Sequence, residues 1–181
     1  MRIRTATPAD ADEMVQVRTA SWRAAYAGLV DADVLAGLPE EAPERYVRHL
    51  ARKRPLEIEF VAEKGPYVIG FAVFTWDHDE ADEDGAGPGV PGEVQSIYVH
   101  PDHWSRGAGR ALMNEGVRWL ADQGFAPVRV WIMEGSEISR RFYERYGFAS
   151  DGARKTVELS GATIPCERLT LKVGAGPGPR R

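Results

Sequence analysis

The chain has 181 residues, of which 43% are hydrophobic and 28% charged, and its net charge is −4. A chain of this size and composition can bury the core of one globular domain, and no apolar run is long enough to cross a bilayer. Lys and Arg form no stripe interleaved with aromatic residues, so a nucleic-acid partner is not expected. The first residues lack the apolar segment of a secretory signal, which favours a cytoplasmic location.

The first half of the chain contains strand and helix patterns. "MRIRTA" predicts a short strand, and Thr7 followed by Pro8 predicts the N-cap and first residue of a helix. Residues on one face of this helix recur at three- and four-residue spacing, and Gly28 ends it. A second helical stretch follows from Asp31 to Pro55. "LEIEFVAE" and "YVIGFAVFTW" then predict a hairpin that turns at "KGP".

The second half continues with the strand "EVQSIYV", a turn, and a helix over residues 108–123. "VRVWIM" predicts a strand, Ser136 to Tyr146 a helix ended by Gly147, and "ARKTVEL" with "CERLTLKV" a closing strand pair. Residues 1–173 are expected to form one domain. The Gly- and Pro-rich segment 174–181 is expected to be a disordered tail.

The connections between the strands predict the sheet. Hairpins produce antiparallel pairs, whereas the helix that begins at Ala108 must carry the chain to a parallel neighbour. The predicted fold is therefore α/β with a mixed, mostly antiparallel sheet. On the last helix, Ile138, Phe142 and Tyr146 are expected to face inward, with Tyr143 one step from that face.

Three other features of the sequence concern charge and metal chemistry. A single cysteine, Cys166, excludes an internal disulfide and is interpreted as a buried strand residue. No metal site is expected, because the histidines of "HPDH" lie in a turn without further ligands at fixed spacing. Six acidic residues lie between Asp77 and Asp84. They either attract cationic amines or form a solvated mobile loop.

The turn "HPDHWSRGAGR" is a candidate phosphate-binding site, because a helix N-terminus presents free N–H groups and the positive end of the helix dipole. Gly107 and Gly109 let the backbone come close to a ligand, and Arg106 and Arg110 add positive charge. The turn lacks the Gly-Lys-Ser/Thr of a Walker loop, and Leu112 replaces the small third residue of a dinucleotide fingerprint. Glycines that only allow a tight start to the helix would explain the same pattern.

Together with "EGSEISRRFYERYGF", this turn resembles the GNAT superfamily of acetyl-CoA-dependent N-acetyltransferases, over about Ile3 to Val173. "WSRGAG" matches both glycines of the family signature Gln/Arg-x-x-Gly-x-Gly/Ala, with Trp104 at its first position. Ser136 stands where the family commonly has an asparagine. The resemblance implies a mixed, mostly antiparallel sheet, helices on both of its faces, and a splayed strand pair that holds the cofactor.

The resemblance also implies acetyl-CoA as co-substrate, without a metal. Its pyrophosphate is expected on the N–H groups of the turn, and its pantetheine arm along a strand edge, as an added strand would lie. The implied cofactor-binding residues are Ile97, Tyr98, Val99, Ser105, Arg106, Gly107, Ala108, Gly109, Arg110, Ser136 and Tyr143.

Acetyl transfer requires a neutral amine, stabilisation of an oxyanion, and a proton for the leaving thiolate. The resemblance implies Glu93 as the base. A carboxyl with a pKa of about 4 needs partial burial or a water relay for this role. An N–H near Ile97 would meet the oxyanion, and Tyr143 would protonate the thiolate. Trp22 and Tyr26 are expected to border the acceptor pocket, although aromatic residues at helical spacing also form cores.

Several functional alternatives stay open at this point. We expect direct attack in a ternary complex, because no histidine lies near Cys166 in the sequence to activate it. The acceptor is a small amine, an aminosugar, or a peptide amine such as a protein N-terminus or a lysine. A catalytically weak acyl-CoA sensor and a site for another nucleotide are the competing hypotheses. A homodimer through the closing strands is plausible by resemblance.

Overall fold

The computed structural model describes residues 1–38, 43–52, 55–82, 84–159 and 162–172. One seven-stranded sheet has the strand order β1-β2-β3-β4-β5-β7-β6. The strands are β1 (Arg2–Thr5), β2 (Ile58–Lys64), β3 (Tyr67–Trp76), β4 (Gly92–Val99), β5 (Val128–Met133), β6 (Ala149–Leu159) and β7 (Ala162–Leu171). The α-helices are α1 (Ala11–Ala25), α2 (Ala32–Ala36), α3 (Pro43–Ala51), α4 (Ala108–Asp122) and α5 (Glu137–Tyr146). The predicted mixed, mostly antiparallel sheet is confirmed.

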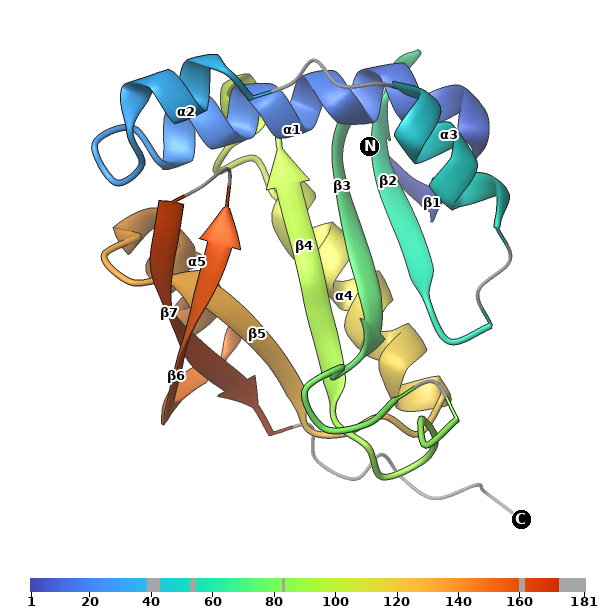
Figure 1. Ribbon diagram of the computed structural model, residues 1–181. Helices are drawn as coiled ribbons and strands as arrows, with labels where there is room; N and C mark the ends of the chain where they lie inside the picture. Colours follow the sequence, from blue (N-terminus) through green and yellow to red (C-terminus); the bar gives the residue numbers. More distant parts are fainter. Residues whose placement is uncertain (39–42, 53–54, 83, 160–161, 173–181) are drawn as a thin grey trace.

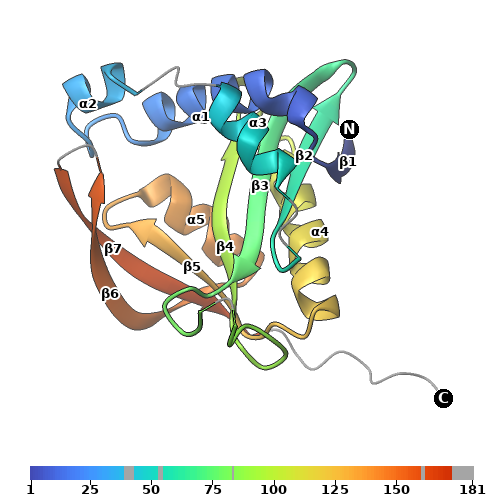
Figure 2. The same ribbon diagram turned by 45° about the vertical axis from the view of Figure 1, so that its right-hand side comes forward.

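The sheet is divided at β4 and β5, its one parallel pair within the described residues. These strands pair through Gly92 with Val128 and Glu93 with Arg129, and then diverge toward their C-terminal ends (Figures 1 and 2). Helix α4 carries the chain between them, because a parallel connection must return to the same end of the sheet. The result is a splayed opening between two half-sheets.

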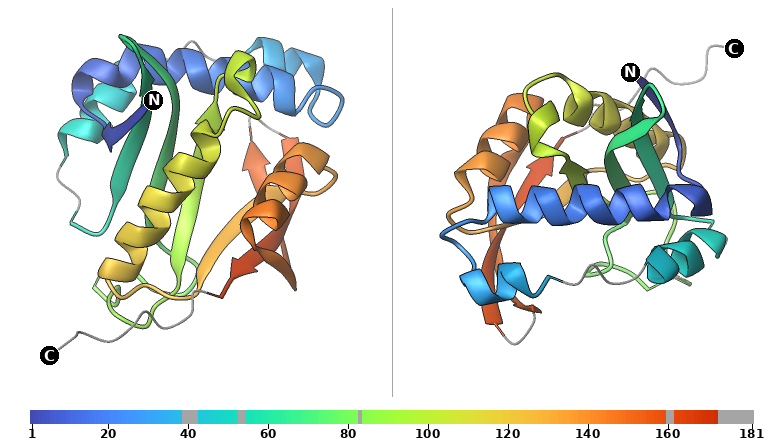
Figure 3. Two further views of the ribbon diagram at one scale, coloured as in Figure 1. Left: turned by 180° about the vertical axis from the view of Figure 1, so that it is seen from behind. Right: turned by 90° about the horizontal axis from the view of Figure 1, so that it is seen from above.

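Helices cover both faces of the sheet, as Figure 3 shows from behind and from above. Helices α4 and α5 lie on one face, here called the α4 face, over a core that includes Leu112, Met113 and Leu120. Helices α1, α2 and α3 lie toward the other, here called the α1 face. There Met14 and Val17 of α1 pack on β2 and β3. Alternation along each strand therefore decides which side chains reach which face.

The start of the first helix follows the predicted cap closely. Thr7 and Asp10 form a capping box around a single 3₁₀ turn, Pro8–Asp10, and α1 begins directly after it. Arg4 of β1 donates to the same Asp10 carboxylate at 2.6 Å, so strand and helix are joined by one ion pair. This hydrogen bond outweighs the opposing effect of burial and lowers the pKa of Asp10 to about 2.

Two expectations about helices are wrong. The stretch from Asp31 to Pro55 forms two helices, α2 and α3, and Gly37 ends the first. On α5, Phe142 and Tyr146 pack on the core as expected, but Ile138 is 47% exposed and Tyr143 is 5% exposed. The physical reason is that a four-residue step overruns the helical turn by about 40°, so a series of such steps moves off the buried face.

Of the helices in the described ranges, none has the length and apolar character needed to cross a membrane. The tail predicted over residues 174–181 lies outside the described residues.

Candidate active site

The turn between β4 and α4 exposes backbone at the N-terminus of the helix. Ser105 has φ 59° and Gly107 has φ 88°, so two residues of the turn adopt the left-handed conformation. Gly107 is the N-cap and provides no side-chain cap. The first N–H groups of a helix have no intrahelical partner, so those of α4 are available to an anion. The turn therefore fits a phosphate group through its backbone.

The second glycine of the turn also has a packing role. A Cβ on Gly109 would lie 2.9 Å from the Phe142 ring, so this glycine lets α4 and α5 approach each other. Tyr146 of α5 also donates to Asn114 of α4 at 3.1 Å. These contacts join the two half-sheets on the α4 face.

The two residues that depart from the family pattern have structural roles here. The indole N–H of Trp104 donates to the Val99 carbonyl at 2.6 Å and ties the turn to the end of β4. Ser136 is 3% exposed and caps α5, where its hydroxyl accepts from the Ser139 N–H at 3.4 Å. Trp104 therefore stabilises the turn, and Ser136 caps the N-terminus of α5.

The strand edge at the opening includes the three β4 residues expected to contact the cofactor. Beyond Glu93, β4 has no ladder partner on its β5 side within the described residues. Ile97 and Val99 pack into the core of the α4 face, whereas Tyr98 packs on the α1 face. Backbone groups on this edge are thus available to pair with an extended ligand.

Glu93 lies at the closed end of the opening, where β4 and β5 still pair. It is half-buried and makes no ion pair within the part of the chain that the structure describes. Burial, followed by the neighbouring charge of Asp77, raises the pKa of Glu93 to about 7. Partial burial was the expected means of making this carboxyl a base, and the raised pKa agrees with it.

The acidic loop that follows β3 is bound to the other half-sheet. Arg129 of β5 contacts the 1%-exposed Asp77 at 2.9 Å and Glu80 at 2.6 Å. Arg168 of β7 lies 3.9 Å from Glu80. The interpretation as a solvated loop is wrong for the buried Asp77, whereas Glu80 is ion-paired but 44% exposed. Their charge is neutralised locally, which also weakens the alternative of long-range steering.

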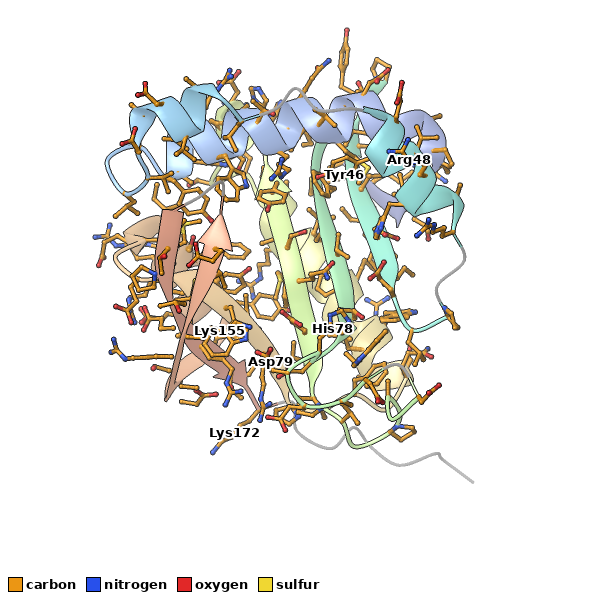
Figure 4. The ribbon with its side chains drawn as sticks, in the orientation of Figure 1. Tyr46, Arg48, His78, Asp79, Lys155 and Lys172 are labelled. Atoms are coloured by element: carbon orange, nitrogen blue, oxygen red, sulfur yellow. The ribbon has the colours of Figure 1, made fainter. Side chains whose placement is uncertain are left out.

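A third contact from this loop crosses the opening to β6 (Figure 4). Lys155 of β6 contacts Asp79 at 2.6 Å, and its ammonium lies 4.3 Å from the centre of the Trp131 ring. The hydrogen bond from Lys155 lowers the pKa of Asp79. An aromatic face and a carboxylate thus hold an alkylammonium at this point.

Three tyrosines from different elements lie close enough to interact electrostatically. They are Tyr26 after α1, Tyr98 of β4 and Tyr143 of α5. Ionisation of Tyr98 would raise the pKa of Tyr26, and ionisation of either would raise the pKa of Tyr143. Burial raises the pKa of Tyr143 far above its usual value, with Tyr26 and Tyr98 adding to the effect. The Tyr143 hydroxyl therefore keeps its proton at neutral pH, which a proton donor requires.

The residues expected at the acceptor pocket lie on the α1 face of the opening. The rings of Trp22 and Tyr26 pack edge to face, with 4.8 Å between their centres. They belong to an apolar cluster that also includes Tyr98, Trp131 and Met133. The indole N–H of Trp22 is buried without a hydrogen-bond partner among the described residues. Trp22 is thus both part of a cluster and a donor without an acceptor.

Sequence reasoning singled out the acidic run that begins at Asp77 but missed Arg129, Trp131 and Lys155. Alternation in "VRVWIM" already places Arg129, Trp131 and Met133 on one strand face, and the acidic run precedes β4. The missing information was the register of β5 with β4 and β7. It brings these side chains to the loop after β3.

Two clusters elsewhere invite a chemical interpretation. Cys166 is buried, as expected, and lies in the apolar cluster of the α1 face. His49 of α3 contacts Glu57 at 3.1 Å and Glu59 at 2.5 Å, with atoms close enough to hold a cation. These hydrogen bonds raise the pKa of His49 to about 9. In the structure the imidazole contacts both carboxylates, and the contact with Glu59 ties α3 to β2.

Comparison with known proteins supports one family. The model of the Acetyltransferase (GNAT) family matches residues 16–148. The chain is 33% identical over 165 residues to the uncharacterized N-acetyltransferase YuaI of Bacillus subtilis, covering 90% of this chain and 87% of that protein. It is 40% identical to the mycothiol acetyltransferase of Nocardiopsis dassonvillei over 81 residues, 44% of this chain and 24% of that enzyme.

Solved structures share the fold. A PaiA N-acetyltransferase from Thermoplasma acidophilum in complex with coenzyme A has a TM-score of 0.69 at 18% identity, with 92% of this chain and 96% of that chain covered. The acetyltransferase yncA from Salmonella typhimurium, with its cofactor acetyl-CoA, has a TM-score of 0.71 at 19% identity, with 99% and 98% covered.

Proposed function

The chain belongs to the acetyltransferase (GNAT) family and is an acyltransferase, and on this premise we propose that it transfers the acetyl group of acetyl-CoA to a primary amine by direct attack in a ternary complex. The observation that carries the proposal is Glu93, a carboxyl with a pKa of about 7 at the closed end of the splayed strands. A pKa near the working pH is the property that a general base needs.

The proposed cofactor site uses backbone more than side chains. Two left-handed residues and the uncapped N-terminus of α4 support binding of the pyrophosphate at Ser105 to Arg110. The β4 edge at Ile97, Tyr98 and Val99 supports binding of the pantetheine arm. Bound there, acetyl-CoA supplies a thioester carbonyl that an amine can attack.

In the proposed reaction, Glu93 takes a proton from the acceptor ammonium, directly or through water, and leaves a neutral amine. The amine nitrogen bonds to the carbonyl carbon and the carbon–sulfur bond breaks. A free N–H of β4 near Ile97 donates to the carbonyl oxygen. Tyr143, whose raised pKa keeps it protonated, donates its proton to the leaving sulfur, and the second proton that the nitrogen releases as the amide forms restores the Tyr143 hydroxyl through solvent.

The acceptor is proposed to bind on the α1 face, against Trp22 and Tyr26. The Trp22 indole N–H, buried without a partner among the described residues, supports a contact with an oxygen of the ligand. Tyr26 is largely buried, and this burial raises its pKa to about 12, so it also offers a neutral hydroxyl. Mycothiol acetyltransferases are among the relatives, and small amines are therefore included with peptides and aminosugars as acceptor candidates.

The proposal is tested in two steps. Calorimetric titration with acetyl-CoA measures cofactor binding, and free-thiol release then measures turnover over a panel of amines, peptides and aminosugars. Micromolar binding with amine-dependent thiol release is the expected result. Binding without release over the whole panel would instead favour the acyl-CoA sensor, and preferred binding of ATP or NAD would contradict the cofactor assignment.

A further inference from the structure

The α1 face of β5 carries a cation-binding surface that a side chain of the protein itself fills. The Lys155 ammonium lies 4.3 Å from the centre of the Trp131 ring and 2.6 Å from the Asp79 carboxylate. An aromatic face next to a carboxylate is a favourable environment for an alkylammonium, and Lys155 shows that such a group fits here.

This surface lies next to the proposed base. Glu93 pairs with Arg129, and Trp131 lies two residues further along β5 on the same face. The charges of Lys155 and Asp79 both influence Glu93, which places all three groups in one electrostatic neighbourhood. The cation-binding surface and the base therefore face the same opening.

Given the proposed function, we propose that the surface formed by Trp131 and Asp79 is a second cation subsite of the acceptor cleft, and that the acceptor is an aliphatic diamine. Its reacting nitrogen lies at Glu93, while its second ammonium displaces Lys155 from Trp131 and Asp79. Lys155 thus occupies the subsite when no acceptor is bound.

The exchange is balanced in charge. One ammonium leaves Asp79 and another arrives, so the Asp79 carboxylate keeps a cationic partner. The Lys155 side chain is 33% exposed and that of Asp79 is 48% exposed, so the lysine can turn into solvent. A monoamine has no second ammonium and leaves Lys155 in place.

The neighbouring cation does not exchange in this way. The Arg168 guanidinium lies 5.5 Å from the same ring, but it contacts Asp151 at 2.8 Å and lies 3.9 Å from Glu80. Several partners hold Arg168, whereas Lys155 has one ion-pair partner among the described residues. Lys155 is therefore the exchangeable occupant.

Steady-state acetylation of diamines, from ethylenediamine to hexamethylenediamine, tests the inference against monoamines of the same chain lengths. We expect one diamine length to be preferred. Lys155→Met removes the competing ammonium and should raise the diamine-to-monoamine ratio of kcat/KM about threefold to tenfold. Asp79→Asn removes the carboxylate and should lower the ratio by a similar factor.

Arg154→Met is the matched control, because Arg154 precedes Lys155 on β6 and contacts Glu134 at the surface instead. Its ratio should equal that of the wild type. An unchanged ratio in both Lys155→Met and Asp79→Asn would overturn the inference, as would equal use of diamines and monoamines by the wild type.

Calorimetric binding of each diamine of the series, with coenzyme A present, separates this inference from the proposed function. If no amine releases thiol, the proposed function fails. Tighter diamine binding by Lys155→Met than by the wild type would still support the subsite, and equal binding would overturn it.

Discussion

The two ends of the splayed opening are built differently. At the end proposed to bind the cofactor, the site consists of backbone: a left-handed turn, the first N–H groups of α4, and the free edge of β4. At the amine end, it consists of charged side chains: Glu93, Asp77 and Asp79 with the cations of β5 and β6. The residue types at the first end can therefore vary, whereas the second end needs particular charged side chains.

This difference follows from what each end is proposed to bind. Phosphate and pantetheine offer atoms that N–H and C=O groups recognise, and any residue type supplies these groups. An amine must lose a proton, which requires a side chain of suitable pKa. Substitutions should therefore act through chemistry at the amine end and through backbone conformation at the cofactor end.

The largest effect is expected for Glu93→Gln. Loss of the base should lower kcat about a hundredfold to a thousandfold. In the wild type, kcat/KM should rise with pH and level off above about pH 7, where Glu93 is ionised. The variant should lose this rise. Glu44→Gln, a change at an 81%-exposed side chain of α3, is the control.

Stability gives an independent check on Glu93. Its folded pKa of about 7 exceeds the ordinary value of 4.5, so the folded state binds the extra proton. The wild type should therefore lose stability as pH rises from 4.5 to about 7. Urea denaturation at several pH values should show this loss in the wild type and less of it in Glu93→Gln. Equal pH profiles would contradict the shifted pKa.

Tyr143→Phe should have the next largest effect. Without the hydroxyl, the thiolate leaves unprotonated, and kcat should fall about tenfold to a hundredfold. The affinity for acetyl-CoA should stay within about twofold, because the ring still packs against Phe142 and Phe148. Turnover equal to that of the wild type with normal binding would disprove the acid role. Tyr67→Phe, at a 65%-exposed tyrosine, is the control.

A smaller effect is expected for Gly107→Ala at the cofactor end. Its φ of 88° costs a residue with a Cβ about 1 kcal/mol, and relief of that strain would move the N–H groups of the turn. Affinity for coenzyme A should fall about fivefold to tenfold. Gly152→Ala is matched, because Gly152 has φ 86° and open space around it in β6. Gly152→Ala should lose about as much stability as Gly107→Ala but should keep the wild-type affinity for coenzyme A.

The smallest effect is expected for Arg110→Gln. Arg110 is exposed on the first turn of α4, where salt and water screen its charge. The dissociation constant for coenzyme A should rise about twofold, and less at high salt. A loss larger than that of Gly107→Ala would mean that side-chain charge, and not backbone, dominates the cofactor end.

The sequence by itself determined the elements and the family. Local signals were sufficient for this: the cap at Thr7 and Asp10, the hairpin turn at Gly65, the glycine at 107, and the alternation in β5. Such signals depend on neighbours in the chain, so they can be recognised without knowing what packs against them. The boundaries of β5 and the N-cap of α5 at Ser136 agree with those predicted.

Only the tertiary structure decided the surroundings of the site. The burial that raises the pKa of Glu93, the binding of the acidic loop by Arg129 and Lys155, and the packing of Phe142 on Gly109 all join segments far apart in the chain. Desolvation and ion pairing depend on distance in space, and the register between half-sheets sets that distance. Periodicity in one segment carries no information about it.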